Sequence, residues 1–288
     1  MKPDLAERIG RAHRDGRPLV MGVVNVTPDS FSDGGQFASL ERAVAQAVTL
    51  ASQGADILDI GGESTRPGAD PVGEQLELER VVPVIEAVHA ACPAAISIDT
   101  SKPVVMRAAI RAGASMINDV YALRAPGAVQ AAADLGVPVC LMHMQGEPRT
   151  MQADPHYQDV VDDICDFFRQ RIDACLKAGI GREGLIVDPG FGFGKTLAHN
   201  LELLAGLQAL QGLGHPVLAG LSRKSMLGAI TGRERPEQRL AASLAAALLA
   251  AQRGAAIIRV HDVAETVDAL KVWLALQDHE RLQGSHKR

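Results

Sequence analysis

The sequence predicts an α/β protein built as a single (β/α)8 TIM barrel. Two observations support this prediction. Eight short apolar runs alternate with longer segments of helical period, and the runs show no alternation of polar and apolar residues. Strands that are apolar on both faces are typical of a parallel sheet covered by helices, and eight strand–helix units in about 280 residues form a barrel. Periodicity cannot show closure, so a doubly wound open sheet is the alternative.

The expected strands follow one another at regular intervals along the chain. In order they are Leu19–Val26, Ile57–Ile60, Ala95–Ile98, Met116–Ile117, Val137–Met142, Leu185–Val187, Val217–Leu221 and Ile257–Val260. Between them, apolar residues recur with helical spacing, for example from Leu40 to Ala51 and from Val160 to Ile172. The Ala-rich segment Leu240–Ala251 is predicted to be a packed helix. We expect one domain over residues 1–288, with 1–17 and 280–288 as peripheral termini.

Composition and charge exclude several classes of protein. The 288 residues are 47% hydrophobic and carry a net charge of −5, which argues against a general nucleic-acid-binding surface. No segment has the length and apolarity of a membrane span or the apolar core of a signal peptide. The four cysteines form no metal-ligand or Cys-x-x-Cys spacing, which fits a reduced, cytoplasmic protein: Cys92, Cys140, Cys165 and Cys175.

Polar residues stand at the end of the strand runs. In a barrel these positions converge on one mouth, at the carboxyl ends of the strands. Any one of them could instead be a helix cap or a turn residue, but together they predict a polar active site. They are Asn25, Glu63, Arg66, Asp99, Asn118, Asp119, His143, Asp188, Ser222, Arg223, Lys224, Arg259 and His261.

Motifs spread over residues 21–262 resemble those of the dihydropteroate synthase family. The first is Met21-Gly-Val-Val-Asn-Val-Thr-Pro-Asp-Ser-Phe-Ser-Asp-Gly-Gly35, and the second is Asp59-Ile-Gly-Gly-Glu-Ser-Thr-Arg-Pro-Gly68. Shorter motifs continue in the family's order: residues 97–103, 117–119, 141–146, 188–195, 222–226 and 258–262. The resemblance implies a barrel that joins a pterin pyrophosphate to p-aminobenzoate, with release of pyrophosphate. Members of the family are usually homodimers.

The resemblance also implies a role for particular residues. It places the pterin ring against Asp99, Asn118, Asp188 and Lys224, whose acceptors and donors match the amide and amino edge of that ring. It places the pyrophosphate against Arg66, Arg259 and His261, with Mg2+ as the cofactor on Asn25. It places p-aminobenzoate against Phe31, Thr65, Pro67, Phe193 and Ser225. Arg66, Lys224 and Asp33 are the residues expected to take part in catalysis.

Three other interpretations of these motifs are less consistent with the sequence. A pterin-dependent methyltransferase would share the barrel and the pterin pocket but lack the loops Ser64-Thr-Arg-Pro67 and Ser222-Arg-Lys-Ser225. A non-catalytic pterin-binding paralogue would not need Asn25, Arg66 and Arg259. The segment from Pro189 to Thr196 is similar to a phosphate-binding P-loop, but Pro189 replaces the required first glycine. Phe191, unlike Phe193, is expected to pack beneath this segment.

Overall fold

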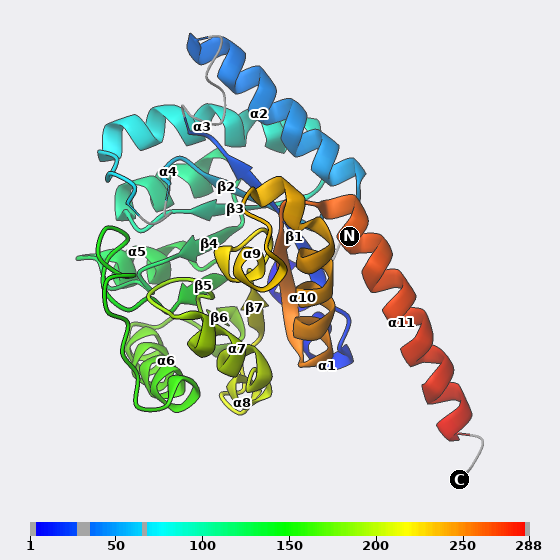
Figure 1. The fold of residues 1–288 in the computed structure, drawn as a ribbon. Helices are drawn as coiled ribbons and strands as arrows, with labels where there is room; N and C mark the ends of the chain where they lie inside the picture. The colour runs from blue at the N-terminus through cyan, green and yellow to red at the C-terminus, as the bar shows by residue number, and fades with distance from the viewer. Residues whose placement is uncertain (1–3, 28–34, 65–67, 286–288) are drawn as a thin grey trace.

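Eight parallel strands form a closed barrel in the order β1 to β8, and this confirms the predicted TIM barrel (Figure 1). The computed structural model describes residues 4–27, 35–64 and 68–285. The strands are β1 Leu19–Asn25, β2 Ile57–Gly61, β3 Ala95–Asp99, β4 Met116–Asp119, β5 Val139–Met142, β6 Leu185–Asp188, β7 Val217–Ala219 and β8 Ala255–Val260. Each expected strand is present, with ends that differ by a few residues.

Helices follow the strands and cover the outside of the barrel (Figure 1). They are α1 Leu5–Asp15, α2 Gly35–Ser52, α3 Glu74–Ala91, α4 Pro103–Ala112, α5 Ala128–Leu135, α6 Val160–Lys177, α7 Leu197–Ala205, α8 Gln208–Gln211, α9 Ser225–Thr231, α10 Leu240–Gln252 and α11 Val263–Ser285. In the described part of the chain, the 3-10 helices Arg182–Gly184 and Pro236–Arg239 directly precede β6 and α10. The helix expected over Leu240–Ala251 is α10.

Local sequence signals explain where several helices begin and end. The side chain of Asp159 caps α6 by accepting from the backbone N–H groups of Val161 and Asp162. Thr196 and His199 form a reciprocal capping box at the start of α7. Pro103 opens α4, where its missing N–H costs nothing, and Gly113 ends that helix in the left-handed conformation.

Two apolar layers hold the barrel together. The larger layer fills the space between the strands and the surrounding helices. The smaller layer lies inside the barrel and receives one side chain from almost every strand: Met21, Ile57, Met116, Cys140, Ile186, Leu218 and Ile257. The N-terminal helix α1 belongs to this inner layer through Leu5 and Ile9. The segment 1–17, expected at the periphery, therefore contributes a helix that closes the amino-terminal end of the barrel.

The long helix α11 runs past the body of the barrel at the C-terminal end of the chain (Figure 1). Its Val272 and Leu276 are exposed, and so are Ile230 on α9 and Leu249 on α10. None of the helices within the described ranges has both the length and the apolar character of a membrane span. All four cysteines lie in described segments and are free thiols.

Candidate active site

The inner face of the barrel changes from apolar to polar along the strands. Because side chains alternate between the two faces of a strand, the residue two places after an inner apolar residue also points inward. Ile57 is followed in this way by Asp59, Met116 by Asn118, and Ile186 by Asp188. On β8, Ile257 is followed by Arg259. The strands therefore deliver a cluster of polar side chains to one mouth, as the sequence predicted.

The register of the first four strands aligns one residue from each strand in a row at the mouth. Asn25 pairs with Gly61, Gly61 with Asp99, and Asp99 with Asn118 across β1 to β4. Gly61 leaves room for the side chain of Asp99. A Cβ atom on Gly61 would lie 3.3 Å from the Cβ of Asp99, which is closer than such contacts usually are. The side chains of Asn25, Asp99 and Asn118 can thus act on one bound molecule.

Arg259 contacts two of the inner polar groups directly and a third, Asn118, through Asp59. Its Nε donates to Asp59 Oδ2 at 2.6 Å, and one terminal nitrogen donates to Asp99 Oδ2 at 3.0 Å. Asn118 Nδ2 donates to the same Asp59 oxygen at 3.0 Å. The carboxylate of Asp59 therefore orients both Arg259 and Asn118.

Burial and charge shift the titration of this cluster. Burial and the neighbouring Asp59 carboxylate raise the pKa of Asp99 to about 8, although Arg259 acts in the opposite direction. Burial disfavours the charged guanidinium of Arg259, but Asp59 and Asp99 outweigh it and raise its pKa further. Because burial and the Asp59 carboxylate outweigh the effect of Arg259 on the pKa, Asp99 retains its proton at a pH where an ordinary aspartate has lost it.

The opposite side of the mouth carries Asp188 and Lys224. Asp188 is 6% exposed, and its Oδ1 accepts from the backbone N–H of Gly190 at 2.8 Å. Burial raises the pKa of Asp188, while the Gly190 N–H, Lys224 and Arg259 act in the opposite direction. Lys224 precedes α9, and its ammonium lies 4.1 Å from the centroid of the Phe193 ring. Lys224 and Phe193, expected to contact different substrates, are therefore adjacent.

The segment after β7 has an unusual backbone that places Lys224 and Ser225. The backbone of Arg223 has a φ of 58°, a value that residues other than glycine rarely adopt. Its guanidinium binds Asp262, with Nε 3.0 Å from Oδ2, and its backbone N–H donates to Ser243 Oγ at 2.9 Å. These contacts hold the strained residue in place. Ser225 is the first residue of the following helix.

His261 lies beside Ser222 at the end of β8. Its Nδ1 is 3.1 Å from Ser222 Oγ, and its backbone N–H donates to the same oxygen at 3.2 Å. Burial and the nearby cations Arg259 and Arg223 lower the pKa of His261 to about 3. The imidazole is therefore neutral near pH 7, and it can offer hydrogen bonds to an anion but no positive charge.

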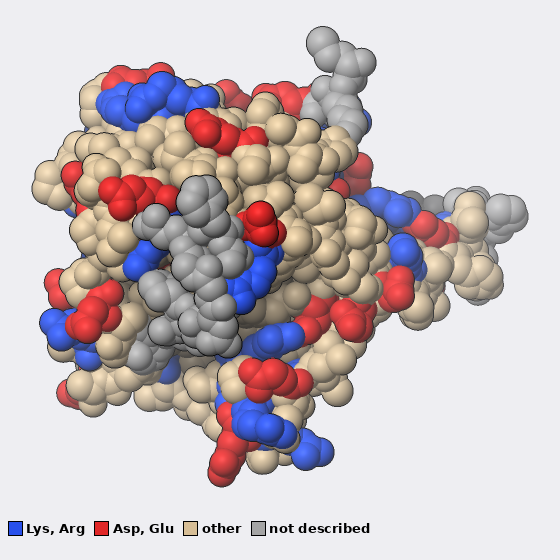
Figure 2. Space-filling model, turned by 90° about the horizontal axis from the view of Figure 1, so that it is seen from above, with Lys and Arg blue, Asp and Glu red and all other residues tan. Residues whose placement is uncertain are grey.

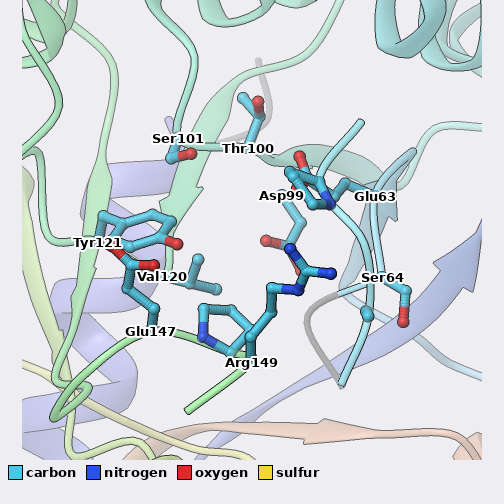
Figure 3. A pocket seen from close by; sticks show the side chains of 12 residues that line it. Glu63, Ser64, Asp99, Thr100, Ser101, Val120, Tyr121, Glu147 and Arg149 are labelled. Carbon is cyan, nitrogen blue, oxygen red and sulfur yellow. The ribbon is translucent and has the colours of Figure 1, made fainter. Parts of the chain in front are cut away.

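A pocket opens beside Asp99, among the segments that follow β2, β3, β4 and β5 (Figure 3). Asp99, Tyr121 and Arg149 line it from three different segments. Lys102 contacts both Glu63 and the fully buried Glu77, and it thereby joins the β2 end to α3. Farther out, the ion pair of Arg149 with Asp70, 2.9 Å long, joins the segments after β2 and β5.

Charge on the outer surface around the mouth is mixed. Figure 2 shows basic and acidic side chains interspersed over this face rather than gathered into one large patch of a single sign. Within the mouth, Arg259 and Lys224 are described side chains that can supply positive charge to an anionic substrate.

Known proteins that are similar to the chain share this barrel. A family model described as "Pterin binding enzyme" matches residues 21–261. A dihydropteroate synthase of Haemophilus influenzae is 56% identical over 90% of this chain and 94% of its own length. The chain belongs to the dihydropteroate synthase family.

Solved structures agree with this assignment. The dihydropteroate synthase of Xanthomonas albilineans with 4-aminobenzoic acid is 61% identical, with a TM-score of 0.87, over 91% of this chain and 93% of that one. The same enzyme with 7,8-dihydropteroate gives 58% identity, a TM-score of 0.82 and coverage of 91% and 94%. The Yersinia pestis enzyme, solved with a sulfonamide drug, is 53% identical, with a TM-score of 0.87, over 91% of this chain and 95% of that one. As a member of this family, the chain is a transferase of folate biosynthesis.

Five of the residues that the dihydropteroate synthase resemblance singled out lie outside the described residues: Phe31, Asp33, Thr65, Arg66 and Pro67. The others are described, and the barrel brings them to one mouth: Asn25, Asp99, Asn118, Asp188, Phe193, Lys224, Ser225, Arg259 and His261. Phe191 is 1% exposed and belongs to the apolar layer under the helices, as expected for a packing residue.

The donor set at the mouth is compatible with Mg2+ that arrives with phosphate. Asn25 ends β1 and offers one amide oxygen, the hard type of ligand that Mg2+ prefers. Across residues 4–27, 35–64 and 68–285, no three His, Cys, Asp or Glu side chains gather in a way that could hold a metal ion. Bound Mg2+ would therefore depend on phosphate oxygens and water for its remaining ligands.

Sequence reasoning assigned no role to Asp59, although it stands in the second family motif. A signal was available: Asp59 is the only charged residue of the strand Ile57–Gly61, and a carboxylate there must be paired or protonated. Its partner Arg259 is distant in the sequence, so the contact itself was not predictable. Lys195, which is buried at the end of the segment 189–195, is a second residue to which the sequence assigned no role.

Proposed function

We propose that the chain condenses 6-hydroxymethyl-7,8-dihydropterin pyrophosphate with p-aminobenzoate to give 7,8-dihydropteroate and pyrophosphate. The observation that carries the proposal is the convergence of Asp99, Asn118, Asp188 and Lys224 on one mouth. Together they offer the acceptors and donors that the pterin edge requires. A relative of the same fold has been solved with 7,8-dihydropteroate, which supports the same product for this chain.

The reaction replaces a C–O bond by a C–N bond. The bond from the pterin methylene carbon to the pyrophosphate oxygen breaks, and its electron pair leaves with the pyrophosphate. The amine nitrogen of p-aminobenzoate then bonds to that carbon and loses a proton. Because the electron-rich pterin can stabilise positive charge at this carbon, we infer an SN1-like path. No protein nucleophile takes part.

The chain's own residues orient the pterin and stabilise the leaving group. Arg259, held by Asp59 and Asp99, supplies positive charge at the pyrophosphate end together with Arg66. Neutral His261 contributes hydrogen bonding there. Mg2+, held by Asn25 and the phosphates, would add positive charge to the leaving group when bound. Asp33 is proposed to interact with the arylamine.

p-Aminobenzoate is assigned to the region around Phe193 and Ser225, with Phe31, Thr65 and Pro67 as further contacts. Phe193 is partly buried and packs against a group of methionines, which suits an aromatic substrate contact. Ser225 at the start of α9 is proposed to bind the carboxylate, because a helix N-terminus offers free N–H donors.

We further propose that the enzyme is a homodimer of the cytoplasm, where its free thiols would stay reduced. The exposed Leu249 and Val272 on the neighbouring helices α10 and α11 support an interface there. Sedimentation of the purified protein tests the dimer, and Leu249→Asp should shift it toward monomer. An unchanged sedimentation coefficient for this variant would place the interface elsewhere.

A coupled assay for pyrophosphate release tests the proposed reaction. Release should require both the pterin pyrophosphate and p-aminobenzoate, and the organic product should be 7,8-dihydropteroate. A protein that binds the pterin without releasing pyrophosphate would instead be a non-catalytic paralogue. Transfer of a methyl group from a pterin would indicate a methyltransferase.

A further inference from the structure

A buried lysine lies at the end of the glycine-rich segment 189–195 that follows β6. Lys195 is 3% exposed. Its Nζ donates to the carbonyl oxygens of Gly190 at 2.9 Å and Phe193 at 3.1 Å, and it lies 3.0 Å from His143 Nδ1. The ring of Tyr157 lies 5.9 Å from the same nitrogen. The ammonium group therefore points into the turns of its own segment rather than toward the mouth.

Neighbouring side chains bind the rest of this segment. Tyr157 Oη donates to the carbonyl of Gly194 at 2.7 Å, and the backbone N–H of Gly192 donates to Asn200 Oδ1 at 2.7 Å. The segment also lies directly against the β5 end. A Cβ atom on Gly190, whose φ is 67°, would lie 2.0 Å from the carbonyl oxygen of His143. The path of the segment is thus determined by hydrogen bonds and close backbone packing.

These contacts fix the backbone of Phe193. Its N–H donates to the carbonyl of Gly190 at 3.1 Å, and its own carbonyl accepts from Lys195. The ring packs against the cluster of Val120, Met142, Met144 and Met151. Its other neighbour is the ammonium of Lys224, 4.1 Å from the ring centroid. The orientation of the Phe193 ring, and with it the site of Lys224, depends on the peptide group that Lys195 binds.

Packing alone does not account for a lysine at this position. Burial lowers the pKa of Lys195 to about 7, and Lys224 acts in the same direction while Asp188 opposes it. Methionine would fill a similar volume without the cost of burying a charge. What methionine lacks is the N–H groups that bind the two carbonyls, and those bonds shape the segment.

We propose that Lys195 is a positioning residue: by binding the carbonyl of Phe193 it fixes the aromatic ring on which Lys224 and the arylamine substrate meet. The inference rests on the proposed function, in which Phe193 contacts p-aminobenzoate. Lys195 touches neither substrate, so its loss should weaken the arylamine site while leaving the pterin site largely intact.

Steady-state kinetics of Lys195→Met, Phe193→Ala and the double variant test the proposal. Each single variant should raise the KM for p-aminobenzoate about three- to tenfold, the range that loss of one aromatic contact implies. The KM for the pterin pyrophosphate should rise less than the KM for p-aminobenzoate, because Lys224 is the pterin-site residue that contacts this ring. The double variant should be no worse than the more affected single variant, because both act through the same ring. Lys271→Met, on the exposed face of α11, is the matched control and should behave as the unchanged enzyme.

The outcomes separate this inference from the proposed function. If Phe193→Ala leaves the KM for p-aminobenzoate unchanged, the assignment of the arylamine site is wrong. If Phe193→Ala raises that KM but Lys195→Met lowers only the melting temperature, or if the two effects multiply, the positioning role is wrong. Should Lys195→Met not fold, Lys195→Leu, which also lacks N–H donors, takes its place in the same cycle with the same two readings.

Discussion

Arg259 and Asp59 are 200 residues apart in the sequence, yet the Nε of the first donates to Oδ2 of the second at 2.6 Å inside the barrel mouth. The same carboxylate oxygen accepts from Asn118. Asp59 therefore orients both Arg259, a proposed pyrophosphate-binding residue, and Asn118, a proposed pterin-binding residue.

Asp59→Asn should weaken binding of the pterin pyrophosphate without changing the fold. The amide keeps one acceptor but loses the negative charge that holds the guanidinium, and a hydrogen bond to a charged group contributes about 1.5–3 kcal/mol. The expected loss of affinity is about 10- to 100-fold. Isothermal calorimetry measures it.

Asp56→Asn is the matched control for this change. Asp56 also pairs with an arginine at 2.6 Å, but it does so with Arg8, just before β2 begins and away from the mouth. Its replacement should alter stability and leave substrate affinity unchanged. Equal losses of affinity in both variants would show that the effect of Asp59 is a general one on the fold.

Asp188→Asn should nearly abolish pterin binding. The amide would place a donor where the carboxylate offers a second acceptor to the ring N–H groups, at a site that is almost fully buried. Breaking a buried, charged hydrogen-bonding pair costs about 3–5 kcal/mol. Calorimetry with the pterin pyrophosphate should therefore show little or no heat, while circular dichroism shows an intact barrel. Near-normal binding would remove Asp188 from the pterin site.

The raised pKa of Asp99 predicts a pH dependence of stability. Because the folded state raises this pKa from 3.8 to about 8, folding favours the protonated carboxyl, and this contribution to stability decreases as the pH rises from about 4 to about 8. Asp99→Asn lacks the titration. The free energy of unfolding of the variant minus that of the unchanged enzyme should rise over this range, by at most about 1.4 kcal/mol per pH unit.

Urea denaturation at pH 5, 7 and 9 checks this sign. Burial also lowers the pKa of four histidines, His13, His143, His215 and His261, and their contributions act in both proteins and cancel in the difference. A difference that stays constant from pH 5 to 9 would mean that Asp99 titrates normally in the folded enzyme.

Sulfonamides should compete with p-aminobenzoate for the proposed arylamine site. They present the same aniline ring with a polar group in place of the carboxylate, so both ligands would occupy the region of Phe193 and Ser225. Inhibition kinetics at several p-aminobenzoate concentrations should show an increased KM with unchanged kcat. Pro67→Ser should change the inhibition constant. A non-competitive pattern would contradict the shared site.

The sequence by itself determined the class of fold and the order of its strands. Runs such as Leu185–Val187 and Val217–Leu221 are apolar on both faces, a property that a covered parallel sheet imposes locally. The sequence also predicted most of the polar residues at the mouth. Residues such as Asp99 and Asp188 stand where strands end, and they lie within the family motifs.

Only the tertiary structure decided which polar groups meet. The pair of Arg259 with Asp59 and the contact of Lys195 with His143 join residues 200 and 52 positions apart, and no local pattern encodes such partners. Barrel closure likewise brings β8 beside β1 through pairing between distant segments. The protonation of Asp99 and the neutrality of His261 depend on burial and on charges delivered by other strands. The periodicity of a sequence indicates whether a residue points into the core or toward solvent. The pKa values of Asp99 and His261 depend instead on which distant residues lie next to them.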